Sequence, residues 1–313
     1  MTTKTAEFVS PKHPDKICDF IADSILDAYL ALDKNSRVAV EVMGGHGLII
    51  INGEVTSSGT PDVERIVQNI VGQNYRVISN LVRQSPEIAR GVDTGGAGDQ
   101  GIMKGYATSQ TKSMLPLEYE LARDLCMKIF EKYPYDGKTQ VTIQDGKVQT
   151  VVASFQNTKN EELLPFVKKN ITASEYLINP AGEWNQGGFD ADTGLSGRKL
   201  IVDNYGPEIA IGGGSFSGKD CTKVDRSGAY IARKIAVDLV KKGATEVFVK
   251  LAYAIGKADP VMASAIVDGK DQTITGYDLT PKGIRETLHL NTIIFADTCT
   301  WGHFGRSFPW DVS

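Results

Sequence analysis

The sequence is poor in the residues that build disulfide frameworks and structural zinc sites. Its 313 residues include only four cysteines and four histidines. The cysteines lie far apart without a CxxC pair, and no HExxH motif occurs. Neither a disulfide scaffold nor a structural zinc site is therefore expected. We assign no chemical role to the cysteines, nor to any histidine except His13.

Long hydrophobic runs and a strong net charge are also missing. The longest aliphatic run covers residues 48–51, far short of the roughly 20 apolar residues that a membrane helix needs. The first residues contain neither an apolar core nor a basic segment, so no secretory signal is expected. A net charge of −4 argues against general nucleic-acid binding. These absences favour a cytoplasmic protein that binds neither membranes nor nucleic acids.

The sequence does contain a pattern that occurs three times. A stretch with apolar residues at helical spacing is followed each time by two short strand-like segments, and the copies begin near residues 14, 116 and 224. A chain of this length suggests two or three domains. Because strands and helices do not simply alternate, a doubly wound sheet is not indicated, and we predict an α+β fold of three related units.

Several elements are predicted at the residue level. Pro14 opens a helix, and the dipeptide Asn52-Gly53 predicts a hairpin turn between two strands. Thr60-Pro61 predicts the start of a second helix. Further helices are expected at residues 116–130, 224–243 and from Thr280-Pro281, and strands at 37–43, 139–144, 147–155, 246–253 and 262–267.

Three long segments rich in glycine and polar residues interrupt this pattern, at residues 84–101, 179–199 and 204–223. Long loops in a compact chain are usually functional or disordered. Charged residues are mixed with the glycines here, and Arg198 and Lys199 follow Gly197. We therefore favour the functional interpretation.

Residues 212–220, GGGSFSGKD, nearly match the phosphate-binding loop GxxxxGK[ST]. The glycines let main-chain N–H groups approach oxygens, Lys219 adds a positive charge, and a helix is expected directly afterwards. Asp220 stands where that loop carries a hydroxyl for magnesium. We favour polyphosphate binding over the alternative, a flexible surface turn.

Residues 96–101, GAGDQG, match the dinucleotide-binding letters GxGxxG. That motif needs a strand before it and a helix after it, whereas here a loop precedes and a strand-like segment follows. We reject the dinucleotide interpretation. Asp99 stays a candidate as an exposed carboxylate on a tight turn, although aspartate also favours such turns for conformational reasons.

His13, Asp15 and Lys16 lie within one turn at a predicted helix start, and Asp225 lies at the start of the corresponding helix of the third unit. Aspartate at a helix start is often only a cap. Two carboxylates at equivalent positions of a repeat are also suited to Mg²⁺, which takes few carboxylates together with phosphate oxygens. The residues leave both interpretations open. Overall they indicate a magnesium-dependent enzyme acting on a polyphosphate nucleotide, without naming a second substrate.

Segments along nearly the whole chain match one family in order. They include HPDKICD at 13–19, GAGDQGIMKGYAT at 96–108, TGLSGRKLIVDNYG at 193–206, GGGSFSGKDCTKVDRSGAY at 212–230 and WGHFGRSFPWD at 301–311, of which GAGDQG and GGGSFSGKD are highly specific together. Together they resemble S-adenosylmethionine synthetase (methionine adenosyltransferase) of the bacterial and eukaryotic type, in a short variant.

The resemblance implies three pseudo-repeated α+β domains, each a mixed sheet with helices on one face. We place them at residues 1–85, 96–182 and 183–313, with a gating loop at 84–100 that is shorter than the family's. It also implies a homodimer, often paired into a homotetramer, with active sites between subunits.

The implied reaction is attack of the methionine sulfur on C5′ of ATP. Tripolyphosphate leaves and is hydrolysed to diphosphate and phosphate. A thioether sulfur carries no proton, so no general base is needed, and alignment and electrostatics supply the catalysis. Cations and metal around phosphates are therefore the expected site.

The resemblance also implies residue roles. His13 is expected near the breaking C5′–O bond, Asp15 and Asp225 on Mg²⁺ (two ions per site), and Glu41 on K⁺. The implied catalytic residues are His13, Asp99, Lys138, Arg198 and Lys219. The implied ATP-binding residues are His13, Asp136, Lys138, Trp184, Asp192, Arg198, Lys199, Ser215 and Lys219. The implied methionine-binding residues are Glu54, Gln84, Asp99, Asp192 and Lys223.

Two other functions are conceivable from the same residues. A kinase or nucleotide triphosphatase with a phosphate loop would form ADP, and the missing Ser or Thr after Lys219 disfavours it. A catalytically silent nucleotide-binding subunit would lack catalytic residues, yet His13, Asp15 and Lys138 are present.

Overall fold

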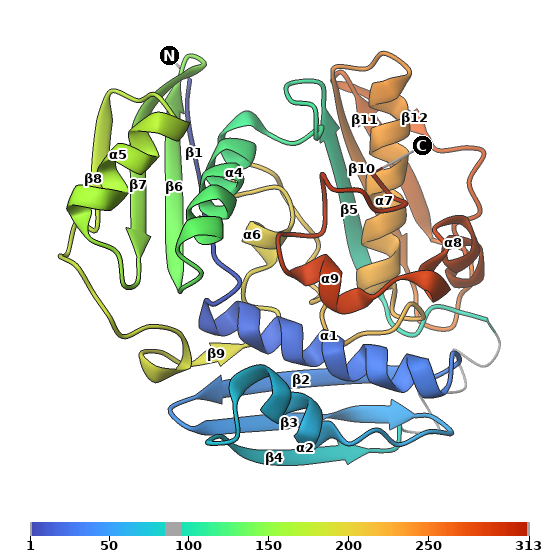
Figure 1. The fold of residues 1–313 in the computed structure, drawn as a ribbon. Coiled ribbons are helices and arrows are strands. Elements are labelled where there is room, and N and C mark those ends of the chain that lie inside the picture. The colour runs from blue at the N-terminus through green and yellow to red at the C-terminus, as the bar shows by residue number, and fades with distance from the viewer. Residues whose placement is uncertain (1, 85–94, 312–313) are drawn as a thin grey trace.

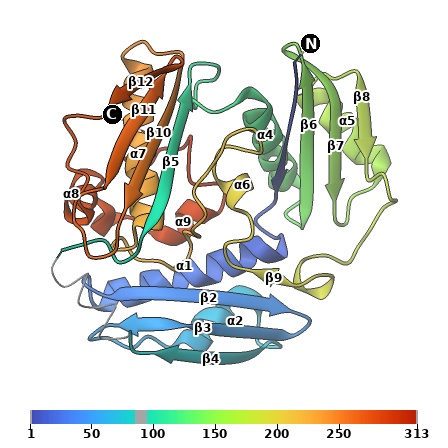
Figure 2. The same ribbon diagram turned by 180° about the vertical axis from the view of Figure 1, so that it is seen from behind.

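The computed structural model of the chain describes residues 2–84 and 95–311. Three four-stranded sheets surround a centre made of helices (Figure 1). The long helix α1 (Pro14–Leu32) lies between one sheet and the other two in both views (Figures 1 and 2). None of the described helices is long and apolar enough to cross a membrane.

The first sheet packs against α1 and α2 (Val63–Val71). Its strands, in spatial order, are β4 (Arg76–Val82), β3 (Leu48–Thr56), β2 (Arg37–Gly45) and β9 (Gly194–Leu195). The β3–β4 pair is parallel and the other pairs are antiparallel, so the sheet is mixed.

The second sheet is also mixed and carries α4 (Leu117–Lys132) and α5 (Asn160–Asn170) on one face. Its strands, in spatial order, are β1 (Thr3–Val9), β6 (Gly137–Gln144), β7 (Lys147–Phe155) and β8 (Glu175–Ile178).

The third sheet is antiparallel throughout and packs against α7 (Val224–Lys241). Its strands, in spatial order, are β12 (Lys270–Thr273), β11 (Met262–Val267), β10 (Glu246–Tyr253) and β5 (Gly101–Thr108). The remaining short elements are α6 (Leu200–Asp203), α8 (Pro281–Thr287), α9 (Phe295–Cys299), and the 3₁₀ turns Gly188–Asp190 and Leu290–Thr292.

The predicted triple order of one helix and two strands is confirmed as α1–β2–β3, α4–β6–β7 and α7–β10–β11. Each sheet is completed by a strand from another part of the chain. β1 pairs with β6, from Thr3 opposite Gln144 to Val9 opposite Lys138. β5 pairs with β10, and β9 pairs with β2. The three units are therefore joined by exchanged strands.

The predicted hairpin turn at Asn52-Gly53 is wrong, because β3 runs through these residues without a break. The turn is formed instead by His46 (φ 50°) and Gly47 (φ 80°), whose left-handed conformations suit a two-residue hairpin. Gly53 allows β3 to approach β2 closely, since a Cβ on this residue would lie 2.1 Å from the Ala39 carbonyl oxygen.

The start of the second helix also differs from the expectation. Asp62, rather than Thr60, caps α2, and its carboxylate accepts a hydrogen bond from the Arg65 main-chain N–H at 3.0 Å. The cap predicted at Thr280 is confirmed, because its hydroxyl accepts from the Gly283 N–H at 3.0 Å.

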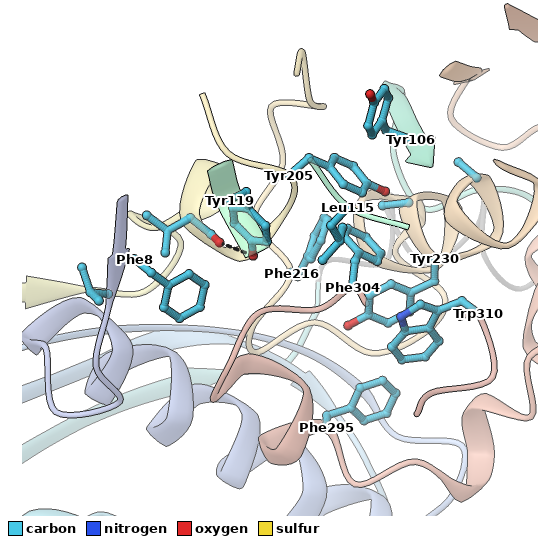
Figure 3. Close-up of a cluster of buried hydrophobic side chains, with 14 of the residues drawn as sticks. Phe8, Tyr106, Leu115, Tyr119, Tyr205, Phe216, Tyr230, Phe295, Phe304 and Trp310 are labelled. Carbon is cyan, nitrogen blue, oxygen red and sulfur yellow. Dashed lines mark hydrogen bonds between the residues drawn. The ribbon is translucent and has the colours of Figure 1, made fainter. Parts of the chain in front are cut away.

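Aromatic side chains fill the centre where the units meet (Figure 3). The rings of Tyr230 on α7 and Trp310 near the C-terminus stack with centroids 3.8 Å apart. Tyr119 on α4 is buried, and its hydroxyl donates to the Val202 carbonyl at 2.7 Å. Stacked rings with satisfied polar ends pack well in a dry interior. The chain end is thereby fixed to the core.

Gly105 gives a test of the packing of β5 on α7. A Cβ on this residue would lie 2.1 Å from the main-chain carbon of Ala232, which cannot move without shifting the helix. Gly105→Ala should lower the free energy of unfolding by about 2–3 kcal/mol through overpacking. Gly213→Ala is the matched control, since its Cβ would meet open space. Equal urea midpoints for the two variants would contradict the packing described here.

Candidate active site

His13 begins the first group of candidate residues, at the N-terminus of α1. It is the N-cap of the helix, and its Nδ1 accepts a hydrogen bond from the Asp15 main-chain N–H at 3.1 Å. The side chain is buried. Because Nδ1 accepts, the neutral ring carries its proton on Nε2, where it can donate to another group.

Burial, together with the positive charges of Lys199 and Lys138, lowers the pKa of His13 to about 3. Asp15 and Asp192 oppose this effect only in part. The imidazole is therefore neutral at physiological pH. It is a fixed hydrogen-bond donor rather than a cation.

Asp15 lies one helical residue beyond Pro14 and is tied to the segment that follows β9. Its carboxylate accepts from the Leu195 N–H at 2.9 Å and from Lys199 Nζ at 2.5 Å. Burial alone would raise the pKa of Asp15, but the hydrogen bonds from Lys199 and Leu195 outweigh it and the pKa is lowered. The group is an anion at any physiological pH.

Asp136 and Lys138 bring the start of β6 to this group. Asp136 accepts from the Gly188 N–H at 2.9 Å, and burial raises its pKa. Lys138 is exposed, and its charge acts on both His13 and Asp136. Asp192 is exposed and accepts from its neighbour, the Thr193 N–H, at 2.7 Å. We call His13, Asp15, Asp136, Lys138, Asp192 and Lys199 the first cluster.

Trp184 and Arg198 lie on the same loop system as this cluster. Trp184 is half-buried, and its indole Nε1–H donates to the Ser154 hydroxyl at 3.1 Å. Arg198 is exposed beside Lys199. Both leave surface that a ligand can contact.

A second cluster lies at the start of α7 and consists of Lys219, Lys223 and Asp225. Lys219 Nζ and the Asp225 carboxylate form an ion pair at 2.8 Å. A bridge between Lys219 and Ala39 ties this segment to β2. A Cβ on Gly214 would lie 2.1 Å from an Asp225 oxygen, so the glycine makes room for the carboxylate.

Asp220 explains why the segment departs from the phosphate-loop pattern. It is buried and accepts from the Val38 N–H at 2.7 Å and the Thr222 N–H at 2.9 Å. It also forms an ion pair with Lys223. Asp220 therefore anchors the loop to β2, so the magnesium hydroxyl of a phosphate loop has no counterpart at this position.

Glu41 on β2 joins the two loops that carry the clusters. Its carboxylate accepts hydrogen bonds from Ser196 and, at 3.4 Å, from Ser215. The Ser215 side chain also lies against Gly197. Glu41 is exposed, and the hydroxyl oxygens of Ser196 and Ser215 lie next to its carboxylate.

The remaining predicted residues are Glu54, Asp99 and Gln84. Glu54 is exposed on β3 opposite Ala39, the residue that bridges to Lys219. Asp99 is exposed and accepts from the Gln100 N–H at 2.7 Å. The Gln84 Oε1 is buried, and none of the described residues hydrogen-bonds to it. Residues 85–94 of the predicted gating loop lie outside the described residues.

The two carboxylates predicted to hold Mg²⁺ lie in different clusters. Asp15 is paired with Lys199, and Asp225 with Lys219. In the described part of the chain, no group of three or more histidine, cysteine or acidic side chains is arranged to hold a metal ion. Their convergence on one site is not seen within a single chain.

Three further aspartates on α1 were not predicted from the sequence. Asp19 and Asp23 are buried and reach these loops, while Asp27 is half-buried and reaches the start of α9. They continue the spacing of Asp15 along α1, one at every fourth residue, as Asp19, Asp23 and Asp27. Each accepts a main-chain N–H from another segment, namely Gly197 for Asp19, Gly218 for Asp23, and Phe295 and Ala296 for Asp27. The signal in the sequence is the fourfold spacing of aspartate on one helix face.

The fold and the clusters define an α+β enzyme of three related units whose lysines and neutral histidine suit a polyphosphate substrate. Family models for the N-terminal, central and C-terminal domains of S-adenosylmethionine synthetase match residues 1–85, 94–184 and 186–312. The chain belongs to the S-adenosylmethionine synthetase family.

Individual relatives agree. The S-adenosylmethionine synthase of Mycoplasmopsis synoviae is 41% identical over 98% of this chain and 94% of its own length. The S-adenosylmethionine synthase of Thermus thermophilus is 40% identical over 98% of this chain and 95% of its own length. A solved structure described as an unusual S-adenosylmethionine synthetase from Campylobacter jejuni superposes with a TM-score of 0.89 at 33% identity, covering 100% of this chain and 97% of that one.

The ionisation of His13 is open to a direct test by NMR. Its imidazole signals should stay constant from pH 8 down to about pH 4, because the folded pKa is about 3. Since the unfolded histidine binds a proton near pH 6.5, acidification below that value should favour unfolding through this group.

Removing the charge of Lys199 should raise the pKa of His13, since this lysine lowers it. Lys199→Met is the variant, and Lys12→Met, on an exposed neighbour, is the control. A His13 that titrates near pH 6.5 in the unmodified protein would show that the buried neutral ring is misassigned.

Proposed function

We propose that this chain is an ATP:L-methionine S-adenosyltransferase that releases tripolyphosphate and hydrolyses it to diphosphate and phosphate. The observation that carries the proposal is the first cluster, in which a neutral buried imidazole lies beside Asp15 and two lysines. Membership of the S-adenosylmethionine synthetase family supports it.

The reaction forms one bond and breaks one bond. A lone pair of the methionine sulfur attacks C5′, and the C5′–O bond electrons leave with tripolyphosphate. No proton moves from the nucleophile. His13 Nε2–H donates a hydrogen bond to the leaving oxygen as its negative charge grows, which lowers the barrier without acid–base exchange.

Cationic side chains neutralise the leaving group. Lys199 and Lys219 are each held beside a carboxylate, while Lys138 and Arg198 are exposed. The phosphate oxygens of a triphosphate carry negative charge, so they bind these cations more strongly than water does. The site therefore binds the product-like charge distribution most tightly, as catalysis requires.

The remaining residues divide between the two substrates. Trp184 offers an indole face for adenine, and Asp136, Asp192 and Ser215 contact the nucleotide. Glu54, Gln84, Asp99, Asp192 and Lys223 bind methionine. The buried Gln84 Oε1 supports this division, because no described residue donates to it and it can accept from a donor such as the methionine ammonium.

The carboxylates fit the expected cations. Asp15 and Asp225 would each hold one Mg²⁺ with phosphate oxygens completing the shell, and both are already held beside a positive charge. Glu41, with two serine hydroxyls next to it, would hold K⁺. Bound Mg²⁺ supplies charge neutralisation of the polyphosphate.

The active unit is a homodimer, which can pair further into a homotetramer, with each site built from the first cluster of one subunit and the second cluster of its partner. Exposed apolar side chains on the first sheet support this arrangement. Met43 lies on the same face of β2 as Glu41, and Ile78 and Val82 lie on β4. The outer faces of the second and third sheets are likewise turned away from α4 and α7 (Figure 2).

The three domains are assigned to residues 1–85, 96–182 and 183–313. The matches of the three family models support this division. Cytoplasmic ATP and methionine are the substrates, without nucleic-acid or membrane partners. Four free cysteines, three of them buried, suit a reducing compartment.

The role of His13 is tested by His13→Asn, because Asn can still cap α1 while it removes the Nε2 donor. Adenosyl transfer should fall about 100-fold or more, and tripolyphosphate hydrolysis should fall less, with products measured by mass spectrometry. His289→Asn is the control on an exposed histidine whose left-handed φ of 51° asparagine tolerates. Equal losses of both activities would contradict the leaving-group role, and ADP as the product would contradict the proposed function.

The interfacial site is tested by Val82→Arg on the open face of the first sheet. Sedimentation should show a monomer, and the variant should lose nearly all transfer activity because each site then lacks half its residues. Ile294→Arg, on another exposed apolar residue at the start of α9, should remain oligomeric and active. A fully active monomer would refute the arrangement.

A further inference from the structure

Helix α1 carries a line of aspartates that reach out of the helix to hold loop backbone. Residues four apart lie above one another on a helix, so Asp15, Asp19, Asp23 and Asp27 share one face. Asp19 and Asp23 are almost completely buried. Their partners are the two loops that carry Lys199 and Lys219.

Asp19 holds the loop before Lys199. One carboxylate oxygen accepts from the Gly197 N–H at 2.8 Å, and the other accepts from Lys16 Nζ at 3.1 Å. Lys16 is fixed in turn by Asp203, whose carboxylate accepts from the same Nζ at 2.5 Å. Gly197 has a left-handed φ of 72°, so this peptide stands at a sharp bend two residues before the lysine.

Asp23 holds the peptide directly before Lys219. Its Oδ1 accepts from the Gly218 N–H at 2.9 Å and from Arg226 Nη1 at 2.6 Å, while Oδ2 accepts from Nη2 at 2.8 Å. Arg226 Nη1 also donates to the Lys219 carbonyl at 3.1 Å. The main chain at this lysine is thus held from its N–H side and its C=O side by one buried ion pair.

Charged acceptors make stronger hydrogen bonds to main-chain N–H groups than neutral ones do. A buried ion pair adds little to net stability compared with apolar packing, because desolvation opposes it. What the buried pair does supply is a fixed direction for the peptides that it binds. The site needs such fixation, since displacement of a catalytic group by about 1 Å costs about 100-fold in rate.

We propose that Asp19 and Asp23 are positioning residues of the transfer reaction, which set Lys199 and Lys219 by holding the main chain in front of each lysine. This inference rests on the roles proposed above for the two lysines. Arg226 acts with Asp23 as the second half of that hold.

Asp27 provides a matched control on the same helix face. It accepts from the Phe295 and Ala296 N–H groups at 2.8 and 2.9 Å and so caps α9, whose residues have no proposed part in substrate binding. Its bonding resembles that of its two neighbours. It differs from them in being half-buried and in holding α9 instead of a lysine-bearing loop, whereas Asp19 and Asp23 are buried and also paired with Lys16 and Arg226.

The experiment compares Asp19→Asn, Asp23→Asn and Asp27→Asn in the full chain. Asparagine keeps one oxygen acceptor but turns an NH₂ group toward a donor, so each change loosens one loop. For Asp19→Asn and Asp23→Asn, kcat/KM for ATP should fall about 10- to 100-fold at temperatures where circular dichroism shows a folded chain. Asp27→Asn should stay within about 2-fold of the unmodified protein.

Amide hydrogen exchange separates positioning from general loss of stability. Exchange of the Gly197 amide should accelerate in Asp19→Asn alone, and that of the Gly218 amide in Asp23→Asn alone. Where Asp23→Asn does not fold, Arg226→Lys replaces it. Lysine keeps a positive charge opposite Asp23 but lacks the guanidinium fork, which donates to both Asp23 oxygens and to the Lys219 carbonyl.

Two results would overturn the inference. The first is a kcat/KM that stays unchanged in Asp19→Asn and also in Asp23→Asn or its replacement Arg226→Lys. The second is a loss of kcat/KM that follows the loss of thermal stability equally in all variants, including Asp27→Asn. Lys199→Ala and Lys219→Ala are measured alongside. If those two variants stay fully active, the proposed site itself fails. If they are inactive while the aspartate variants are not, only the positioning role fails.

Discussion

The structure depends on buried carboxylates that supply hydrogen-bond acceptors to irregular main chain. The glycine-rich loops have few regular partners for their N–H groups, and a buried N–H without an acceptor is strongly destabilising. Helix α1 provides the acceptors from one face, where Asp19 and Asp23 meet the Gly197 and Gly218 amides. Loops rich in glycine can thereby hold charged side chains in fixed places.

Carboxylates also balance the positive charges that gather in the candidate active site. Each of the two lysines that face the proposed phosphates is matched to a carboxylate, as Lys199 is to Asp15 and Lys219 to Asp225. Each half of the site is thus close to neutral by itself. Burial and the neighbouring cations keep His13 neutral, which suits a reaction whose nucleophile carries no proton.

The sequence is informative where local physics decides the structure. Strong apolar periodicity predicts α1 and α7, and the bounds of β10 and β11 agree with the predicted segments residue by residue. The dipeptide Asn52-Gly53 gave a wrong prediction, because Gly53 allows two strands to approach each other closely and does not form a turn. β1 was not predicted, since its partner β6 lies more than a hundred residues further on.

The candidate site shows the same limit. Motifs such as HPDK and GGGSFSGKD indicate which residues carry chemistry, but their division into two clusters depends on β9 crossing to β2 and on the Lys219 bridge to Ala39. No local pattern reveals such long-range pairing. The fourfold spacing of aspartates is visible in the sequence, yet only the fold shows that Asp19 and Asp23 face loops and not solvent.

The exchanged strands have a consequence for biosynthesis. β1 is synthesised first, but it has no strand to pair with until β6 has been made. In the same way, β5 cannot pair until β10 has been made. The first sheet is likewise open until β9 arrives at Gly194–Leu195. None of the three units contains all four strands of its own sheet, so we expect each sheet to be completed only after a distant segment is synthesised, and a truncated chain to expose strand edges that promote aggregation.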